Sequence, residues 1–233
     1  MTKNLPSRPK VAIVDYGLGN LFSIRLACER AGLEAVVTSL KKEILGSDAV
    51  ILPGVGAFGD AMATLRRMDL VSVLRDAVAS DKPFMGICLG LQLLMSESYE
   101  FGFHKGLGII EGQVIRFENL TEAGRILKVP QVQWNRIYQR NWGSKGTSWT
   151  GSLLDGLNNG EFMYFIHSFF VHPDDSSVVL SVSTYGHVDF CSSLCRRNIF
   201  AFQFHPERSS QAGFQIYRNL ARFVYLKQAG GGE

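Results

Sequence analysis

Cys88 lies at the centre of the sequence Gly86-Ile87-Cys88-Leu89-Gly90, where its thiol could act as a nucleophile. The apolar run at 83–87 predicts a buried strand before it, and apolar residues at helical spacing over 91–95 predict a helix after it. Glycines around such a corner permit a strained turn that pushes the nucleophile out over the sheet. The N-terminus of the following helix favours a thiolate. We therefore expect a reactive Cys88, with a buried structural cysteine as the alternative.

The second reactive stretch is Phe202-Gln203-Phe204-His205-Pro206-Glu207. Pro206 disfavours the α conformation for His205, so this segment is predicted to be extended. Side chains two residues apart in extended chain project to the same side, which makes His205 and Glu207 neighbours. The carboxylate can then hold one imidazole nitrogen while the other faces a nucleophile. If the preceding strand ends beside the Cys88 strand, a Cys–His–Glu triad results; a surface histidine near a carboxylate is the alternative.

Pro53-Gly54-Val55-Gly56 follows another apolar strand. Glycines there let backbone N–H groups turn into a cavity, as an oxyanion hole requires. The amide of Leu89, directly after the candidate nucleophile, is the natural second donor. An ordinary turn is the alternative, and the glycines match neither a dinucleotide-binding nor a phosphate-binding loop.

The composition is that of a globular chain large enough to bury a core. Its 233 residues are 46% hydrophobic and 19% charged, and the formal net charge of +3 is too small and dispersed to indicate a nucleic-acid partner. No apolar run reaches the roughly 18 residues of a membrane span, and no signal-peptide core precedes the first strand. Four cysteines without zinc-like pairing, in a chain that needs no disulfides, predict a reduced cytoplasmic protein with no metal site. The cysteines are Cys28, Cys88, Cys191 and Cys195.

Strand and helix patterns alternate through the first hundred residues, which indicates parallel strands covered on both faces. Strands are predicted at 10–16, 33–38, 47–52 and 83–87, and helices at 21–31 (with Asn20 as N-cap), 58–67 and 70–80. Further strands are predicted at 108–117, 126–129, 162–167, 178–185, 187–191 and 199–204, before an amphipathic helix at 209–228. We expect a three-layer α/β fold of the flavodoxin-like kind, with a mixed, mostly parallel sheet. Residues 1–9 are predicted to be a flexible leader, 10–228 one domain and 229–233 a disordered tail.

These motifs resemble those of the class I, or triad, glutamine amidotransferases. The matching sequences are GICLGLQ around Cys88, FHPE with His205 and Glu207, and PGVG at 53–56, and the similarity extends over 11–223. The resemblance implies that the cysteine attacks the side-chain amide of glutamine, the histidine moves protons and the glutamate orients the histidine. Water then releases glutamate, and neither a metal nor an organic cofactor is implied.

The resemblance also assigns residues to the glutamine site. Gln92 lies four residues after Cys88, on the same helix face, and can reach a bound amide; a solvent-facing helix residue is the alternative. The backbone of Ser168 and Phe169 is expected to hold the α-carboxylate and amine, and Glu100 to be a further substrate-binding acid. The implied oxyanion and substrate-binding residues are Gly54, Val55, Gly56, Leu89, Gln92, Glu100, His167, Ser168 and Phe169.

Three further stretches, at 15–20, 53–62 and 164–168, resemble the glutaminase subunits of imidazole glycerol phosphate synthases in particular. Such a subunit passes ammonia to a cyclase subunit that is a (β/α)8 barrel. The heterodimer makes imidazole glycerol phosphate and AICAR in histidine biosynthesis. The partner-facing residues that this resemblance implies are Asn20, Trp134 and Asn135.

The chain departs from that pattern at one stretch. Where the family usually reads V-P-H-M-G-W-N, this chain has Gln131 and Gln133 at the His and Gly positions, and Phe169 replaces the tyrosine of the usual His-Ser-Tyr. These changes leave the triad intact but alter the expected partner surface. A paralogous glutaminase that serves another acceptor, such as a sugar-amidating synthase, is therefore an alternative. Two more alternatives are a stand-alone glutaminase and a non-catalytic regulatory subunit.

Overall fold

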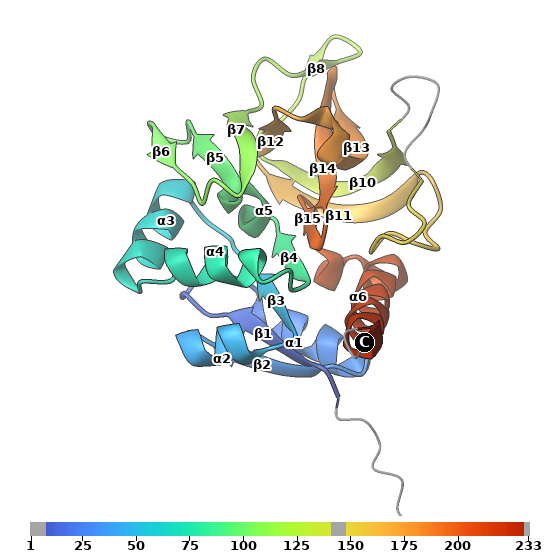
Figure 1. Ribbon diagram of the computed structural model, residues 1–233. Coiled ribbons are helices and arrows are strands. Elements are labelled where there is room, and N and C mark those ends of the chain that lie inside the picture. The colour runs from blue at the N-terminus through green and yellow to red at the C-terminus, as the bar shows by residue number, and fades with distance from the viewer. Residues whose placement is uncertain (1–7, 141–147, 231–233) are drawn as a thin grey trace, which may run out of the picture.

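The computed structural model describes residues 8–140 and 148–230. Five parallel strands form one half of the main sheet, in the order β2-β1-β3-β4-β15 (Figure 1). Their bounds are Lys10–Val14 (β1), Glu34–Thr38 (β2), Ala49–Leu52 (β3), Phe84–Ile87 (β4) and Ile199–Phe202 (β15). The last strand in sequence thus lies directly beside β4, and the two end at the same edge of the sheet.

The other half of the sheet is largely antiparallel and continues from β15 through β14, β12, β7, β5 and β6. The strands β10 and β11 pair with each other, and β10 joins the sheet through β13. Their bounds are Met95–Ser98 (β5), His104–Lys105 (β6), Ile110–Arg116 (β7), Gln131–Gln139 (β10), Glu161–His167 (β11), Phe169–Pro173 (β12), Val179–Tyr185 (β13) and Val188–Arg196 (β14). A separate two-stranded ribbon consists of Thr121–Glu122 (β8) and Arg125–Ile126 (β9).

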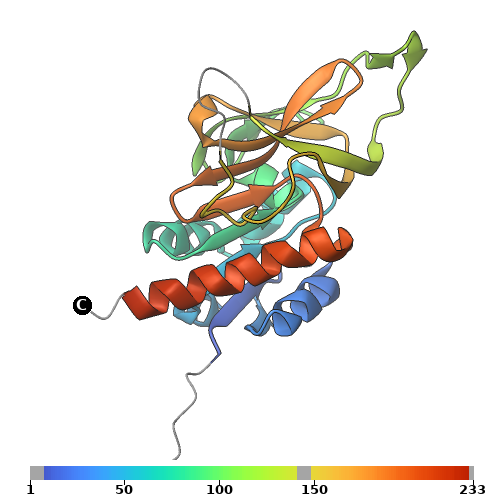
Figure 2. The same ribbon diagram turned by 90° about the vertical axis from the view of Figure 1, so that its right-hand side faces the viewer.

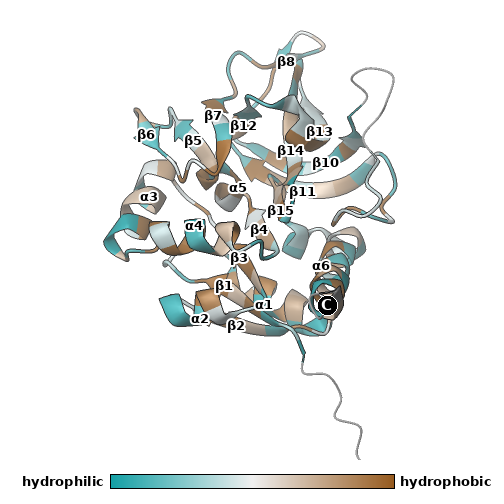
Figure 3. Cartoon of the chain, viewed as in Figure 1, coloured by the Kyte–Doolittle hydropathy of each residue, from teal (hydrophilic) through white to brown (hydrophobic). Residues whose placement is uncertain are grey.

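Helices cover both faces of the parallel half and bury a separate apolar core on each. The helices are Leu21–Arg30 (α1), Lys41–Gly46 (α2), Phe58–Arg67 (α3), Val71–Ala79 (α4), Leu89–Leu93 (α5) and Ser210–Gly230 (α6), with 3₁₀ turns at Ser176–Val178 (η1) and Pro206–Arg208 (η2). One core lies under α2, α3 and α4, and the other under α1 and α6. Figure 2 shows α6 running along one side of the sheet, and Figure 3 shows its mixture of hydrophobic and hydrophilic residues. The predicted three-layer α/β fold with a mixed sheet is confirmed.

Several predicted elements need correction. The helix after Cys88 ends at Leu93, and Met95, which we assigned to it, begins β5. The strand predicted at 126–129 is reduced to the end of β9, while α2, β5, β10 and β12 were not predicted at all. Asn20 occupies the N-cap position of α1, but its side chain makes no capping hydrogen bond.

The chain ends also differ from expectation. Helix α6 continues through Gly230, so the first two residues of the predicted disordered tail at 229–233 are helical. Residues 231–233, and residues 1–7 of the predicted leader, lie outside the described residues. Within the described ranges, no helix is both long and apolar enough to cross a membrane.

Candidate active site

Cys88 occupies a strained turn between β4 and α5. Its backbone has φ 53° and ψ −108°, a region that residues with a side chain rarely adopt. Gly90 explains how the turn stays tight, since a Cβ there would overlap the carbonyl oxygen of Leu52 on the neighbouring strand. The strained elbow predicted from the glycines is therefore present. With only five residues in α5, however, a helix macrodipole contributes less to a thiolate than we expected.

His205 follows β15, and the parallel pairing of β15 with β4 brings it to the same sheet edge as Cys88. Its backbone is extended, and its N–H donates to the carbonyl of Tyr164 at 2.9 Å. His205 Nδ1 lies 2.8 Å from Glu207 Oε1, and the two side chains are 4% and 1% exposed. The predicted pairing exists, but its geometry was wrong: Glu207 belongs to the 3₁₀ turn η2, which curls the carboxylate back toward the ring.

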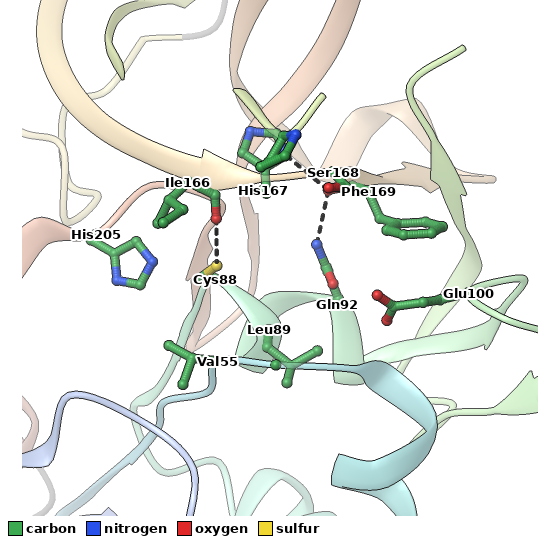
Figure 4. Close-up of a pocket in the computed structure, with 12 residues that line it drawn as sticks. Val55, Cys88, Leu89, Gln92, Glu100, Ile166, His167, Ser168, Phe169 and His205 are labelled. Carbon is green, nitrogen blue, oxygen red and sulfur yellow. Dashed lines mark hydrogen bonds between the residues drawn. The ribbon is translucent and has the colours of Figure 1, made fainter. Parts of the chain in front are cut away.

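The other ring nitrogen of His205 faces Cys88 (Figure 4). Burial lowers the pKa of His205, but the Cys88 thiolate and the Glu207 carboxylate raise it more, to about 10. Cys88 raises this pKa both by its charge and by hydrogen bonding to the ring. In the structure the thiol is directed at the carbonyl of Ile166, 3.8 Å from Sγ.

The segment 53–56 borders Cys88 from β3. Tyr16 donates its hydroxyl to the carbonyl of Pro53 at 2.8 Å, and a Cβ at Gly54 would collide with that same hydroxyl. Gly56 has φ +98°, which favours glycine, and the Val55 side chain is 42% exposed. The segment is therefore fixed at Gly54 and open to solvent beyond it.

A pocket of about 250 Å³ opens above Cys88. Figure 4 shows the labelled side chains around it, with His205 on one side of the sulfur and Gln92 and Glu100 on the other. The pocket is lined by Val55, Gly56, Cys88, Leu89, Gln92, Glu100, Pro130, Ile166, His167, Ser168, Phe169 and His205. All the predicted oxyanion and substrate-binding residues line it except Gly54, which lies buried beneath the loop.

Gln92 is buried, so the solvent-facing alternative is wrong. Its Nε2 donates to the carbonyl of Phe169 at 2.9 Å and to Oε1 of Gln203 at 3.2 Å. Gln203 in turn donates to the Cys88 sulfur at 3.8 Å. A continuous line of polar groups thus connects the pocket wall to the sulfur.

Glu100 stands at the far end of the pocket from His205, beside a second, larger cavity of about 750 Å³ that it also lines. Its Oε2 accepts the backbone N–H of Phe58 at 2.6 Å. Burial raises the pKa of this carboxyl, while the bond to Phe58 lowers it.

His167 also lines the pocket but is held differently from His205. Its Nδ1 donates to the carbonyl of Phe169 at 2.8 Å, and its ring packs among Phe117, Phe165 and Phe190. Burial lowers its pKa to about 4, so the ring is neutral at physiological pH.

The predicted partner-facing residues lie apart from the pocket. Trp134 on β10 is 47% exposed and packs edge-on against Tyr164 of β11, so it is not a core residue. Asn135 is half-buried and donates to the carbonyl of Thr184 at 2.8 Å. Asn20 is half-buried at the start of α1.

Four residues of the site or its support were not predicted: the pocket-lining Pro130 and Ile166, and the supporting Gln203 and Ser209. Gln203 has no distinguishing neighbour in sequence, although its alternation with Phe202 and Phe204 on a strand signals a side chain on the His205 face. Ser209 Oγ donates to the carbonyl of His205 at 2.7 Å and accepts the N–H of Tyr164 at 3.0 Å, which ties the histidine loop to β11. Only the fold brings β11 there, so no local signal reveals Ser209.

A cysteine on a strained strand–helix turn, with a buried histidine–carboxylate pair beside it, defines an α/β enzyme of the cysteine-triad class. The comparisons with known proteins agree. The family model described as "Glutamine amidotransferase class-I" matches residues 12–221. The chain therefore belongs to the class I glutamine amidotransferase family.

Curated relatives are similar over nearly the whole chain, and a solved structure shares its fold. The imidazole glycerol phosphate synthase subunit HisH of Aquifex aeolicus is 45% identical over 91% of this chain and 96% of its own length. That of Geobacter metallireducens is 42% identical over 91% and 97%. A crystal structure of a glutamine amidotransferase shares the fold, with a TM-score of 0.65 at 22% identity over 94% of this chain and 98% of that one.

Proposed function

We propose that this chain is the glutaminase subunit of an imidazole glycerol phosphate synthase. It hydrolyses glutamine and passes the ammonia to a cyclase subunit in histidine biosynthesis. The observation that carries the proposal is the position of His205, held by Glu207 on one side and facing Cys88 on the other at the floor of a pocket. We further propose that residues 10–228 act as one domain and that the protein works in the cytoplasm, where its four free cysteines stay reduced.

The reaction proceeds in two halves. The Cys88 thiolate attacks the amide carbon of glutamine, and the N–H groups of Val55 and Leu89 stabilise the oxyanion. The His205 imidazolium gives its proton to the nitrogen, the C–N bond breaks, and ammonia leaves a thioester on Cys88. Neutral His205 then takes a proton from a water molecule, while the oxygen of that water attacks the thioester carbon. Collapse expels the thiolate, releases glutamate and restores the ion pair.

Glutamine binds with its amide toward Cys88 and its amino-acid end toward Glu100. The Glu100 carboxylate pairs with the α-ammonium, and the backbone at Ser168 and Phe169 holds the α-carboxylate. Gln92 already hydrogen-bonds the Phe169 carbonyl, so it also fixes that part of the wall. His167 completes the wall through its own bond to the same carbonyl.

The outer face of β10 and β11 is the surface that we propose for the barrel partner. It carries the exposed side chains of Val132, Ile166 and Trp134. Val132 pairs across the strands with Ile166, and Trp134 with the half-buried Tyr164. Tyr164 also supplies the carbonyl that accepts the His205 N–H. A partner seated on Trp134 would therefore touch a strand that directly supports the catalytic histidine.

The altered family stretch favours the histidine-pathway acceptor over another one. Gln131 is fully buried and opposite His167 in the strand register, so its replacement of histidine is internal. Of the two altered glutamines, only Gln133 is exposed, so only Gln133 could contact an acceptor protein. The intact triad argues against a non-catalytic regulatory role.

The test measures glutaminase turnover of the chain alone, with the barrel subunit, and with the barrel plus its nucleotide ligand. We expect low activity of the isolated chain and strong activation by the liganded barrel, because the barrel would align the oxyanion donor Val55 N–H. One misaligned oxyanion donor costs roughly 10²–10³ in rate. Trp134→Ala should weaken the activation, whereas Tyr225→Ala on the exposed side of α6 should not. Full activity of the isolated chain, unchanged by either addition, would make a stand-alone glutaminase the better interpretation.

A further inference from the structure

A side groove of about 750 Å³ opens beside the glutamine pocket, at the Glu100 end that lies away from His205 (Figure 4). It is bounded by residues 99–101, 115–118 and 168–170 and by Val188. Three of its lining residues, Glu100, Ser168 and Phe169, also line the glutamine pocket. The side groove and the glutamine pocket therefore adjoin along a shared wall.

Hydrogen bonds hold the segments around the side groove together. The N–H of Phe117 donates to the carbonyl of Ser168 at 3.0 Å, which ties the end of β7 to the shared wall. The N–H of Tyr99 donates to the carbonyl of Val114 at 3.3 Å, which ties the segment before Glu100 to the same strand. The side groove is thus a fixed feature of the fold.

Arg116, the last residue of β7, is the only cationic residue among the described residues that line the side groove. Its side chain is exposed and makes no hydrogen bond or ion pair within the described part of the chain. The strand register pairs Arg116 directly with Phe169 of β12. Directly paired residues project to the same face, with Cβ atoms about 4.5–5.5 Å apart. The long Arg116 side chain can therefore reach the shared wall.

The charges of the side groove match the amino-acid end of glutamine. Glu100 offers a carboxylate to the α-ammonium, and Arg116 offers a guanidinium to the α-carboxylate. A guanidinium can bind a carboxylate through two parallel, charge-assisted hydrogen bonds. Glu118 is the other acid of the side groove, and it makes no ion pair with Arg116, so the guanidinium stays available.

The proposed barrel partner would leave the side groove open. The Ile166 side chain lies on the outer face of β10 and β11, while the Ile166 carbonyl faces the Cys88 thiol in the glutamine pocket. A barrel seated on that face would cover the Cys88 end of the pocket. No residue of β10 or β11 lines the side groove. Glutamine would then have to arrive from the Glu100 end.

We propose that the side groove is the route by which glutamine enters the assembled enzyme, and that Arg116 binds the α-carboxylate of glutamine there. The contact persists when the amide reaches Cys88, because Phe169, opposite Arg116, lines both spaces. Arg116 thus selects for a free α-amino acid. The inference rests on the glutaminase function proposed above.

The first experiment measures glutamine hydrolysis by the assembled complex. Arg116→Gln should raise KM for glutamine about 5- to 10-fold and leave kcat unchanged, because the lost contact serves substrate and transition state equally. Arg116→Lys keeps the charge and should recover most of the affinity. Arg125→Gln, an equal loss of charge on the exposed β9 and outside both cavities, should keep the wild-type KM. A wild-type KM for Arg116→Gln would overturn the inference.

The second experiment asks whether the α-carboxylate is the group that Arg116 binds. Glutamine α-amide, which lacks this charge, is used as a competitive inhibitor of glutamine hydrolysis in the wild-type and Arg116→Gln complexes. Its inhibition constant should be the same in both complexes, although KM for glutamine differs. An inhibition constant that rises by the same factor as KM would show a general distortion of the pocket and would contradict the proposal.

The third experiment narrows the side groove at Val188, which does not line the glutamine pocket. Val188→Trp should lower kcat/KM for glutamine in the complex, where the side groove is the remaining entrance. In the isolated chain, alkylation of Cys88 by a glutamine analogue should slow less, because the partner side of the pocket is also open. An unchanged kcat/KM in the complex, or an equal loss in both measurements, would overturn the route.

Binding without turnover separates this inference from the proposed function. Glutamine should raise the Tm of Cys88→Ala, and the further substitution Arg116→Gln should require about 5- to 10-fold more glutamine for the same rise. That result, without glutaminase activity in the wild-type complex, would refute the proposed function and leave the Arg116 site standing. An equal dependence of Tm on glutamine in both variants would refute the Arg116 site.

Discussion

His205 and His167 both line the glutamine pocket, but they come from different halves of the sheet. His205 follows β15 in the parallel half, where Glu207 and Cys88 surround it and its pKa rises to about 10. His167 ends β11 in the antiparallel half, where aromatic rings surround it and its pKa falls to about 4. The parallel half thus supplies the ionisable groups of the triad, whereas His167 gives the antiparallel half a neutral part of the pocket wall. The same residue type serves either purpose, according to what the neighbouring strands place around it.

The strongest test of this division removes the nucleophile. Cys88→Ala should abolish glutamine hydrolysis, a loss on the order of 10⁶, while the fold and partner binding remain. A glutamine-analogue alkylator should label Cys88 and none of the other cysteines, because burial raises the pKa of Cys28 and Cys191 to about 12 and that of Cys195 to about 11. Peptide mapping by mass spectrometry checks this. Labelling of another cysteine, with Cys88 unmodified, would contradict the assignment of Cys88 as the nucleophile.

The next effect separates the two partners of Cys88. His205→Ala removes the group that moves protons, whereas Glu207→Gln only weakens its orientation, so the histidine variant should lose roughly 10–10² more in kcat. Steady-state kinetics in the assembled complex measures both. Wild-type activity of Glu207→Gln would show that the buried pair is not used.

The alkaline pH profile sharpens the comparison further. Because the pKa of His205 is raised to about 10, its imidazolium persists well above neutral pH, and kcat/KM should fall only as pH rises through about 10. Above that value the fall should be about tenfold per pH unit. The same shift contributes stability that is complete below the ordinary histidine pKa and is lost as pH rises through about 10. A profile that falls already near pH 7 on its alkaline side would contradict the charged pair.

The smallest expected effect belongs to His167 and lies at the acid end. Its folded pKa of about 4 is below the ordinary 6.5, so the unfolded state binds the proton first and stability falls as pH drops from about 6.5 to about 4. The loss should total about 3 kcal/mol. Urea unfolding at several pH values should show a flatter dependence for His167→Phe than for wild type. The exposed control His187→Gln should keep the wild-type slope.

Local signals were enough for the strands of the parallel half, although helix α2 was missed. Each of its strands is a short apolar run ended by a turn, and the elbow glycines around Cys88 follow from close packing that only glycine permits. The helix after Cys88 was predicted too long, because a continuous apolar run does not distinguish a buried helix from the buried strand β5 that follows it.

The antiparallel half was harder to predict because its sequence pattern is inverted at β10. There Gln131 is buried while Val132 and Trp134 face outward, the reverse of what a lone domain would show. The pattern of β10 makes sense only if the proposed barrel partner covers its outward face.

The backbone of Cys88 carries a consequence for laboratory evolution. A non-glycine residue held at φ 53° and ψ −108° costs about 1–3 kcal/mol, and glycine at this position would recover much of it. Selection for heat resistance alone would therefore favour replacement of the nucleophile itself. The variants obtained that way would be more stable to heat but catalytically inactive. A screen for robust versions of this enzyme has to demand turnover at every round.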